Sequence, residues 1–392
     1  MNDGPLAGMS EVMRLTRSGQ LQEATSTLQG MLRGQPLTPV ATEPVRRTEK
    51  APLKGVFGVI RKEPFRASYA GLVKPALPRR RPVSGWPPDA IGQFITGLYT
   101  SREGSRSYKL YIPGGYRGQS LPLVVMLHGC TQDPDDFAAG TRMNHVAEEH
   151  QCLVLYPAQG QGANPSKCWN WFKECDQRRD QGEPSIVAGI TRRIMSSHNV
   201  DRRRVYVAGL SAGGAMAVIM GMTYPDLYAA VGVHSGLAYG VAHDLPSAFA
   251  VMHRDNVANG RMGIDGARRR TICERVVPII VFHGDRDTTV HPLNGEQVIA
   301  QSLTIPGSGN AETEASSYVT VERGQAAKGH AYTRTIYYDT DGQPSREHWL
   351  VHGAGHAWSG GSPHGSFTDP RGPDATKEMI RFFLKHSQRA PR

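Results

Sequence analysis

The chain has 392 residues, of which 39% are hydrophobic and 20% charged, and its formal net charge is +10. This length suits one α/β domain with about a hundred residues to spare. No apolar run approaches the ~20 residues that span a bilayer, which argues against a membrane-spanning protein. Residues 1–14 lack the basic start and apolar core of a secretory signal, which predicts a cytoplasmic protein, with secretion as the alternative.

Two regions precede the predicted body of the protein. Residues 1–34 carry a broken helical stripe of apolar side chains and predict a helical N-terminal extension, which must dock elsewhere to bury that stripe. Residues 35–90 contain ten of the 27 prolines and a net charge of +7, which predicts an extended basic linker. The linker is either a solvated tether or a contact with an anionic surface, such as the coat of a polymer granule rather than nucleic acid.

The third region, residues 91–392, alternates strand and helix patterns and carries the remaining charge of +3. Such alternation predicts a doubly wound, mostly parallel sheet. An antiparallel pair is expected at 94–98 and 108–112. The parallel strands are expected at 121–127, 153–156, 205–207, 229–233, 276–282 and 348–351. A hairpin from 332–338 turns at 341–342 into the last of these strands, and a final helix follows residue 374.

A glycine-flanked serine follows the strand predicted at 205–207. The segment 209–213 is GLSAG, the G-x-S-x-G pattern of a nucleophile elbow, and a helix-favouring run comes after it. Glycine is needed at both flanks because a side chain there would collide with the neighbouring strand or helix. Ser211 is therefore the candidate nucleophile. Ala212 opens the helix, so its amide N–H is available to bind an oxyanion.

A serine nucleophile needs a base and a carboxylate that orients the base. In α/β-hydrolases these follow the serine in the order acid, then histidine. Asp285 and Asp287 both follow the strand predicted at 276–282, and the H-G-x-x-D spacing favours Asp287 as the acid, with Asp285 as a turn residue. His352 ends the last strand, whereas His356 lies in a glycine-flanked loop that can face the serine. His356 is therefore the predicted base.

The second oxyanion donor is expected in the loop after the strand at 121–127. The candidate there is the amide of Cys130, alone or together with that of Thr131. One such donor lowers the reaction barrier by roughly 3 kcal/mol. The Cys130 side chain can at the same time be a small buried apolar group, because only the amide donates.

The cysteines and histidines show no scaffold or ligand pattern. Five cysteines occur, at positions 130, 152, 168, 175 and 273, and an odd, sparse set predicts no disulfide framework. Cys168 and Cys175 are close enough in sequence to pair in an oxidising compartment, whereas free thiols are expected in the cytosol. His348, His352 and His364 lack a ligand spacing, so no metal or other cofactor is expected.

Three tryptophans occupy predicted loops near the proposed site. Trp169, Trp171 and Trp358 are candidates for a wall that grips an apolar acyl chain, led by Trp358 because it is two residues from His356. The alternative is that Trp169 and Trp171 pack under their own loop.

Five motifs occur in order along the third region. They are HGCTQ (128–132), CWNWF (168–172), GLSAGG (209–214), HGDRDTTV (283–290) and GHAWSGG (355–361). Together, over residues 95–386, the chain resembles the polyhydroxybutyrate depolymerase-type esterases, an α/β-hydrolase group that also contains feruloyl and acetylxylan esterases. The resemblance implies that Ser211, Asp287 and His356 are catalytic and that Cys130 is an oxyanion donor.

The resemblance also implies an activity. It is the cofactor-independent hydrolysis of short-chain hydroxyalkanoate esters, as polymer or oligomer, through an acyl-enzyme. A feruloyl or acetylxylan esterase is the alternative among enzymes. A granule- or partner-binding protein, with residues 1–90 as its working part and a degenerate hydrolase body, is the alternative of another class, and the intact set of motifs argues against it.

Overall fold

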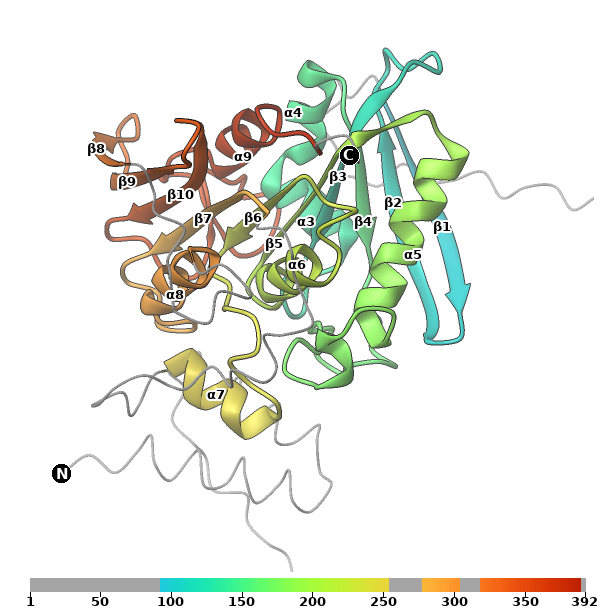
Figure 1. Ribbon diagram of the computed structural model, residues 1–392, viewed down its shortest axis with the longest axis horizontal. Helices are drawn as coiled ribbons and strands as arrows, with labels where there is room; N and C mark the ends of the chain where they lie inside the picture. The colour runs from blue at the N-terminus through green and yellow to red at the C-terminus, as the bar shows by residue number, and fades with distance from the viewer. Residues whose placement is uncertain (1–91, 254–276, 304–317, 389–392) are drawn as a thin grey trace, which may run out of the picture. The chain divides into compact units, whose positions relative to one another are not determined.

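A computed structural model describes residues 92–253, 277–303 and 318–388, all of which belong to the compact unit Gly85–Arg392 (Figure 1). The helical extension predicted at 1–34 and the linker predicted at 35–90 lie outside the described residues.

One sheet organises the described residues (Figure 1). Its strands are β1 (Gln93–Ser101), β2 (Gly104–Ile112), β3 (Leu121–Leu127), β4 (Leu153–Pro157), β5 (Val200–Leu210), β6 (Ala230–His234), β7 (Ile279–Gly284), β8 (Val319–Gln325), β9 (Ala331–Tyr338) and β10 (Pro344–Val351). Their order across the sheet is β1-β2-β4-β3-β5-β6-β7-β10-β9-β8. Six neighbouring strands run parallel: β4, β3, β5, β6, β7 and β10. Antiparallel strands flank them, β2 and β1 at one end of the sheet and β9 and β8 at the other. This confirms the predicted doubly wound, mostly parallel sheet.

The sheet differs from the prediction mainly at strand ends. β7 begins at Ile279 rather than at residue 276, directly after Pro278, which has no N–H to donate to a neighbouring strand. β8 was not predicted, because its alternating pattern is mostly exposed and gives no buried stripe. The predicted hairpin between β9 and β10 is confirmed, with β10 starting earlier, at Pro344.

Helices cover both faces of the sheet. They are α3 (Pro134–Thr141), α4 (Met143–His150), α5 (Gly182–Ser197), α6 (Ala212–Thr223), α7 (Leu245–His253), α8 (Leu293–Ser302) and α9 (Ala375–Phe383), with a short 3₁₀ turn, η1 (Cys175–Gln177). α5, α6 and α8 line the near face in Figure 1. α3, α4 and α9 bury their apolar sides on the opposite face. The final helix begins after Asp374, whose side chain caps it by accepting from the Lys377 amide.

The central strands are apolar on both sides because each side faces a helical layer. In β3, Leu123 and Val125 join the core under α5 and α6, whereas Val124 and Met126 join the core under α3, α4 and α9. All seven β3 residues are buried. This double burial holds the carboxyl ends of the parallel strands in one rigid edge, from which the loops of the site emerge.

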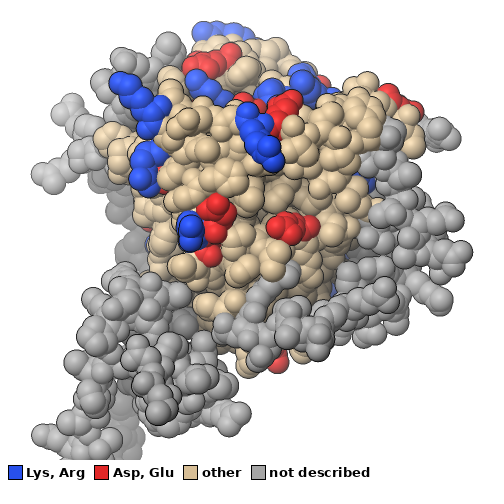
Figure 2. Space-filling view, turned by 90° about the vertical axis from the view of Figure 1, so that its left-hand side faces the viewer, with Lys and Arg blue, Asp and Glu red and all other residues tan. Residues whose placement is uncertain are grey.

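One face of the described unit is mixed in charge. On the face that carries the β8 end of the sheet, basic and acidic side chains are scattered among uncharged ones, and neither sign forms a continuous field (Figure 2). In the described ranges, no helix combines the length and the apolarity needed to cross a membrane.

Candidate active site

Ser211 lies at a sharp turn between β5 and α6. Its backbone has φ 57° and ψ −120°, a conformation that is costly for a residue with a side chain and that turns the chain from strand to helix. The flanking glycines make this turn possible. A Cβ on Gly213 would lie 2.0 Å from the carbonyl oxygen of Leu127, and one on Gly209 would lie 2.3 Å from the backbone of Gly213. The predicted need for glycine at both flanks is confirmed.

Three neighbouring strand ends hold the elbow in place. Leu210 pairs with His234 on β6, and His234 pairs with Phe282 on β7. The Ser211 amide donates to the His234 carbonyl at 2.9 Å, so the serine is fixed to the strand that separates it from β7. The loops after β7 and β10 leave the same edge, because β5, β6, β7 and β10 are parallel neighbours.

Asp287 and His356 form a buried pair above this edge. Asp287 Oδ2 lies 2.7 Å from His356 Nδ1, with the Asp287 side chain fully buried and the His356 side chain 11% exposed. The amides of Thr289 and Val290 both donate to Asp287 Oδ1 at 2.9 Å.

Asp287 is held in its ionised form. Its pKa lies well below the usual range, because hydrogen bonds and the positive potential of His283 and His356 outweigh the opposing effect of burial. An ionised carboxylate can only accept, so His356 Nδ1 carries the proton and donates it to Asp287. In the neutral imidazole, Nε2 then carries the lone pair. Within the described residues, no hydrogen bond occupies either this nitrogen or Ser211 Oγ.

Asp285 and His352 form a second, more exposed pair. Asp285 Oδ2 lies 3.0 Å from His352 Nδ1, and Asp285 Oδ1 accepts from the Gly353 amide at 2.7 Å. The other ring nitrogen of His352 contacts Thr333 Oγ1 on β9 at 2.9 Å. The structure thus brings Asp287 to His356 and Asp285 to a turn, in the arrangement that the spacing predicted.

Backbone bonds join the loop after β7 to the loop after β10. The Asp285 amide donates to the Val351 carbonyl at 3.0 Å, and the Arg286 amide donates to the Ala354 carbonyl at 2.9 Å. Each loop therefore limits the movement of the other. These backbone hydrogen bonds help to fix the distance between the Asp287 carboxylate and the His356 ring, in addition to the direct contact between the two side chains.

Two buried histidines near the site, His234 and His128, are neutral because burial lowers their pKa values. His234 stacks on Phe282 and Trp358, and its Nε2 accepts from the Ser359 amide at 2.9 Å. Burial lowers the pKa of His234 to about 3. Burial likewise lowers the pKa of His128 to about 4.

The amides proposed for the oxyanion come from two segments, the start of α6 and the loop after β3. Ala212 is the first residue of α6, so its N–H has no acceptor within the helix. In the loop after β3, no hydrogen bond among the described residues uses the Cys130 amide, whereas the Thr131 amide donates to the Ser166 carbonyl at 2.6 Å. The alternative that Thr131 contributes its amide is therefore not supported, because that donor is already engaged.

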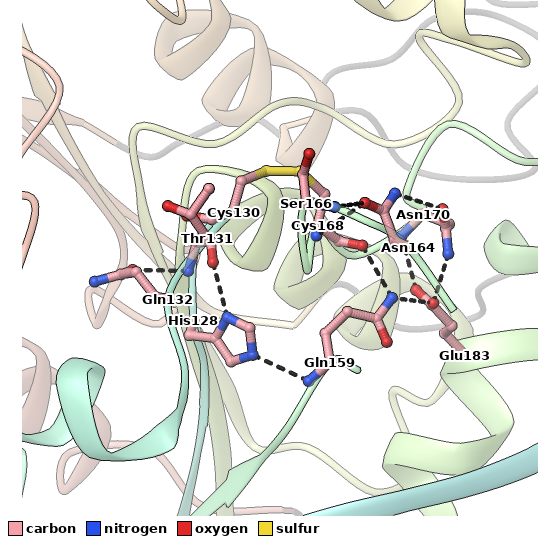
Figure 3. Close-up of a disulfide and its surroundings, with 11 residues drawn as sticks. His128, Cys130, Thr131, Gln132, Gln159, Asn164, Ser166, Cys168, Asn170 and Glu183 are labelled. Atoms are coloured by element: carbon pink, nitrogen blue, oxygen red, sulfur yellow. Dashed lines mark hydrogen bonds between the residues drawn. A yellow bond between two sulfur atoms is a disulfide. The ribbon is translucent and has the colours of Figure 1, made fainter. Parts of the chain in front are cut away.

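Cys130 is covalently joined to Cys168 by a disulfide (Figure 3). The pairing of Cys168 with Cys175, which the sequence left open, does not occur, and the free thiol expected in the cytosol is not found at Cys130 or Cys168. Cys152 is a buried free thiol and Cys175 an exposed one. Proximity in sequence was a poor guide because the fold brings together the loop after β3 and the loop after β4, 38 residues apart.

Glu183, at the start of α5, is a buried residue that the motifs did not identify. Its side chain accepts from the amide and the side chain of Asn170, both at 2.7 Å, and from Gln159 (Figure 3). Gln159 in turn donates to the Cys168 carbonyl at 2.9 Å. Burial and the nearby Asp176 raise the pKa of Glu183. A lone Glu after a glycine gave no signal in the sequence, because its partners come from distant segments.

The three tryptophans are core residues rather than an exposed wall. Trp169 and Trp358 are 0% and 1% exposed, and Trp171 is 6% exposed. The Trp358 indole donates to Thr376 Oγ1 at 3.0 Å, which points its ring into the core under α9. The prediction that these tryptophans form an exposed aromatic wall is therefore wrong. Trp169 and Trp171 are buried, as the alternative prediction of packing under their own loop requires. A position close to His356 in sequence did not predict exposure.

The described residues contain no group of three or more His, Cys, Asp or Glu side chains that could hold a metal ion. The chemistry available at the site is that of a serine hydroxyl, an imidazole, a carboxylate and backbone amides.

Comparison with known protein families identifies the chain. The family model described as esterase PHB depolymerase matches residues 106–326, more than half of the chain. The chain belongs to this family. The match includes the Ser211 elbow, the Asp287 loop and both cysteines of the disulfide. His356 lies beyond it, on the loop after β10.

Individual relatives of the chain are only distantly similar to it. Poly(3-hydroxyalkanoate) depolymerase C of Paucimonas lemoignei is 30% identical over 256 residues, which are 63% of this chain and 57% of the relative. Feruloyl esterase B of Thermothelomyces thermophilus is 27% identical over 202 residues, 47% of this chain and 66% of the relative. The chain thus matches little more than half the length of the depolymerase.

The fold is also that of a solved esterase. Acetyl xylan esterase from Aspergillus awamori superimposes with a TM-score of 0.53 over 74% of this chain and 99% of its own, at 17% identity. At this identity the likeness concerns the fold alone.

Proposed function

We propose that the protein is a serine esterase that hydrolyses short-chain hydroxyalkanoate esters, as polymer or oligomer, through an acyl-enzyme. The observation that carries the proposal is the buried Asp287–His356 contact at the sheet edge from which the strained Ser211 elbow projects. Membership of the depolymerase family and the similarity to a poly(3-hydroxyalkanoate) depolymerase support the substrate class.

The reaction needs only the groups already described. His356 Nε2 takes the proton of Ser211 Oγ, which attacks the ester carbonyl, and the amides of Cys130 and Ala212 bind the oxyanion. His356 then protonates the departing alkoxide. Water, activated in the same way, releases the acyl group and restores the serine. Asp287 keeps the imidazole proton on Nδ1 and stabilises the imidazolium that forms.

Replacing the nucleophile tests this proposal. Ser211→Ala should lower kcat on p-nitrophenyl butyrate by at least about a thousandfold, because oxyanion binding alone leaves only residual catalysis. Circular dichroism and the melting temperature should show an unchanged fold. Ser196→Ala, on the exposed side of α5, is the matched control and should keep the wild-type rate. Activity of the Ser211→Ala protein within tenfold of wild type would reject the assignment.

A feruloyl or acetylxylan esterase remains the second candidate, because a feruloyl esterase is among the relatives. Rates on hydroxybutyrate oligomers and on methyl ferulate separate the two. We expect the oligomers to be the better substrate by kcat/KM. A binding protein with a degenerate site is tested with a fluorophosphonate probe, which labels Ser211 only if the site is intact.

We further propose that the basic segment 35–90 adds contact with the anionic coat of a polymer granule. The segment carries a net +7, whereas residues 91–392 carry +3 over a chain more than five times as long. Such a charge imbalance gives the segment long-range attraction to an anionic surface. A solvated tether without any binding role is the alternative.

The disulfide supports an oxidising compartment as the place of action. Disulfides persist outside the cytosol and are rare in it. Secretion, the alternative to a cytoplasmic enzyme, is therefore the location that we propose.

A further inference from the structure

His283, the first residue of the H-G-x-x-D motif, is a buried side chain that the proposed reaction does not use. It lies near the carboxyl end of β7, opposite Leu350 of β10, and is 0% exposed. Its Nε2 lies 2.8 Å from the Val290 carbonyl oxygen and 3.4 Å from Asp287 Oδ2. One ring nitrogen thus faces both the proposed acid and the loop that carries it.

The contacts of the ring define which nitrogen of His283 carries the proton. A carbonyl oxygen can only accept, so Nε2 donates to Val290. Nδ1 is buried and has no hydrogen-bond partner among the described residues. A proton on Nδ1 would therefore have no acceptor, and this nitrogen keeps its lone pair. His283 accordingly has a single ring proton, on the nitrogen that faces Asp287.

Helix α8 fixes the position of this ring. α8 packs against β7, and its Gly295 lies against the His283 side chain (Figure 1). A Cβ on Gly295 would stand 2.8 Å from His283 Nδ1 and 3.3 Å from His283 Cβ and Cγ. Because position 295 has no side chain, the helix backbone closes over the ring and leaves it no room to turn its N–H away from the acid.

His283 holds Asp287 by two routes. The direct route is the Nε2–H near Asp287 Oδ2, the oxygen that also lies 2.7 Å from His356 Nδ1. At 3.4 Å this contact acts mainly through the positive end of the N–H dipole. The indirect route passes through Val290, whose carbonyl accepts from His283 while its amide donates to Asp287 Oδ1 at 2.9 Å. Both carboxylate oxygens therefore depend on His283 for their position.

A histidine at this position carries a cost that an apolar residue would avoid. Its buried Nδ1 lone pair gains no hydrogen bond from the described residues, and burial of an unpaired polar atom opposes folding. The two contacts of Nε2 are what the fold gains in return, and both are directed at the acid and its loop.

We propose that His283 is a positioning residue that holds the Asp287 carboxylate toward His356, by donating its Nε2–H to the Val290 carbonyl and facing Asp287 Oδ2 with the same proton. His283 does not touch the reacting atoms and acts only through Asp287. The inference rests on the proposed function, because it takes Asp287 as the acid of the site.

Removal of this donor should slow the chemical step. His283→Leu has a side chain of similar volume and no N–H, so the Val290 carbonyl is left unpaired and the carboxylate can tilt. A displacement of about 1 Å can lower a catalytic rate by roughly 10²-fold. We expect kcat on p-nitrophenyl butyrate to fall by about 10–100-fold. KM should stay nearly unchanged, because the fully buried Asp287 side chain does not contact the substrate.

Two further variants separate this role from simple packing. His283→Gln can place a side-chain N–H where Nε2 lies and should recover most of the lost kcat. His348→Leu is the matched control, because His348 is a neighbouring histidine whose Nε2 is also buried and unpaired and whose pKa burial lowers to about 4. It should keep the wild-type kcat. All variants are measured as full-length protein, with circular dichroism and the melting temperature as the checks of folding.

The proton between His356 Nδ1 and Asp287 reports the position of the carboxylate directly. Its downfield resonance in proton NMR is assigned by its loss in His356→Gln. The resonance should move in His283→Leu, return toward its wild-type position in His283→Gln and stay in place in His348→Leu. A residue that only filled space would not move it.

The role of His283 is overturned if folded His283→Leu keeps kcat within twofold of wild type, if His283→Gln is as slow as His283→Leu, or if His348→Leu loses as much activity. Should His283→Leu not fold, Gly295→Ala decides, because a methyl group there must displace the ring while its N–H remains. A lower kcat with a moved resonance would then support the role, and wild-type values of both would overturn it.

Failure of the proposed function looks different. In that case wild type and Ser211→Ala would show the same negligible hydrolysis. Ester hydrolysis that depends on Ser211 but not on His283 would reject the positioning role alone.

Discussion

At the scale of single residues, two aspartates two positions apart have different surroundings. Asp287 is buried, accepts from two amides and contacts His356, whereas Asp285 is partly exposed and contacts His352. The difference arises because the chain turns sharply after β7, so that the first carboxylate faces the turn at residue 353 and the second faces inward.

This difference predicts unequal effects of the same substitution. Asp287→Asn should lower kcat by about 10⁴-fold, since an amide in place of the carboxylate no longer selects the Nδ1-protonated tautomer of the base. Asp285→Asn should lower kcat less than tenfold, because only a partly exposed turn contact changes. Both variants are compared by kcat on p-nitrophenyl butyrate. A larger loss in Asp285→Asn would move the role of acid to Asp285.

At the scale of elements, the elbow depends on the close approach of β3 to the first turn of α6. The Leu127 carbonyl sits where a side chain on Gly213 would have to go. The glycine therefore lets helix and strand touch, and the same contact fixes where the Ala212 amide and Ser211 lie relative to the loop after β3.

Gly213→Ala should separate these elements. Overpacking of this kind costs about 1–3 kcal/mol, and we expect the melting temperature to fall by roughly 3–10 °C together with a clear loss of kcat. Gly160→Ala is the matched control, because a Cβ there meets nothing within 4 Å. It should leave both quantities unchanged. An unaltered melting temperature and kcat in Gly213→Ala would show that β3 and α6 can separate without cost.

At the scale of the whole molecule, most of the net positive charge lies in residues 35–90, which precede the described residues. The segment 35–90 holds a net +7, including three consecutive arginines at 79–81. If this segment contacts an anionic granule coat, binding should be electrostatic and should weaken as salt shortens the Debye length.

Neutralising part of this charge tests the idea. Changing the three arginines at 79–81 to Gln should lower retention on coated granules at low salt about a hundredfold, because three charges at ~1 kcal/mol each amount to ~3 kcal/mol. Rates on soluble esters should not change. The matched control changes Arg102, Arg323 and Lys385, which are exposed on the described unit, to Gln and should retain binding. Equal retention of both variants in a sedimentation assay would leave the segment as a simple tether.

The sequence by itself predicted the sheet, the elbow and the order in which the candidate acid and the candidate base follow Ser211. These features rest on local patterns: apolar runs define buried strands, and the glycines around Ser211 are required by contacts within one strand–helix turn. Parallel strands share one edge, so residues that follow strands must gather there. The Asp287–His356 contact is consistent with that rule, and their catalytic role remains a prediction.

Only the tertiary structure decided which side chains are buried and which cysteines pair. Trp358 is covered by α3, α9 and His234, and Cys130 meets Cys168 across two loops. Burial and disulfide pairing depend on neighbours that come from distant parts of the chain, and these contacts leave no periodicity or spacing in the sequence. For the same reason Glu183, which gathers Asn170 and Gln159, became visible only in three dimensions.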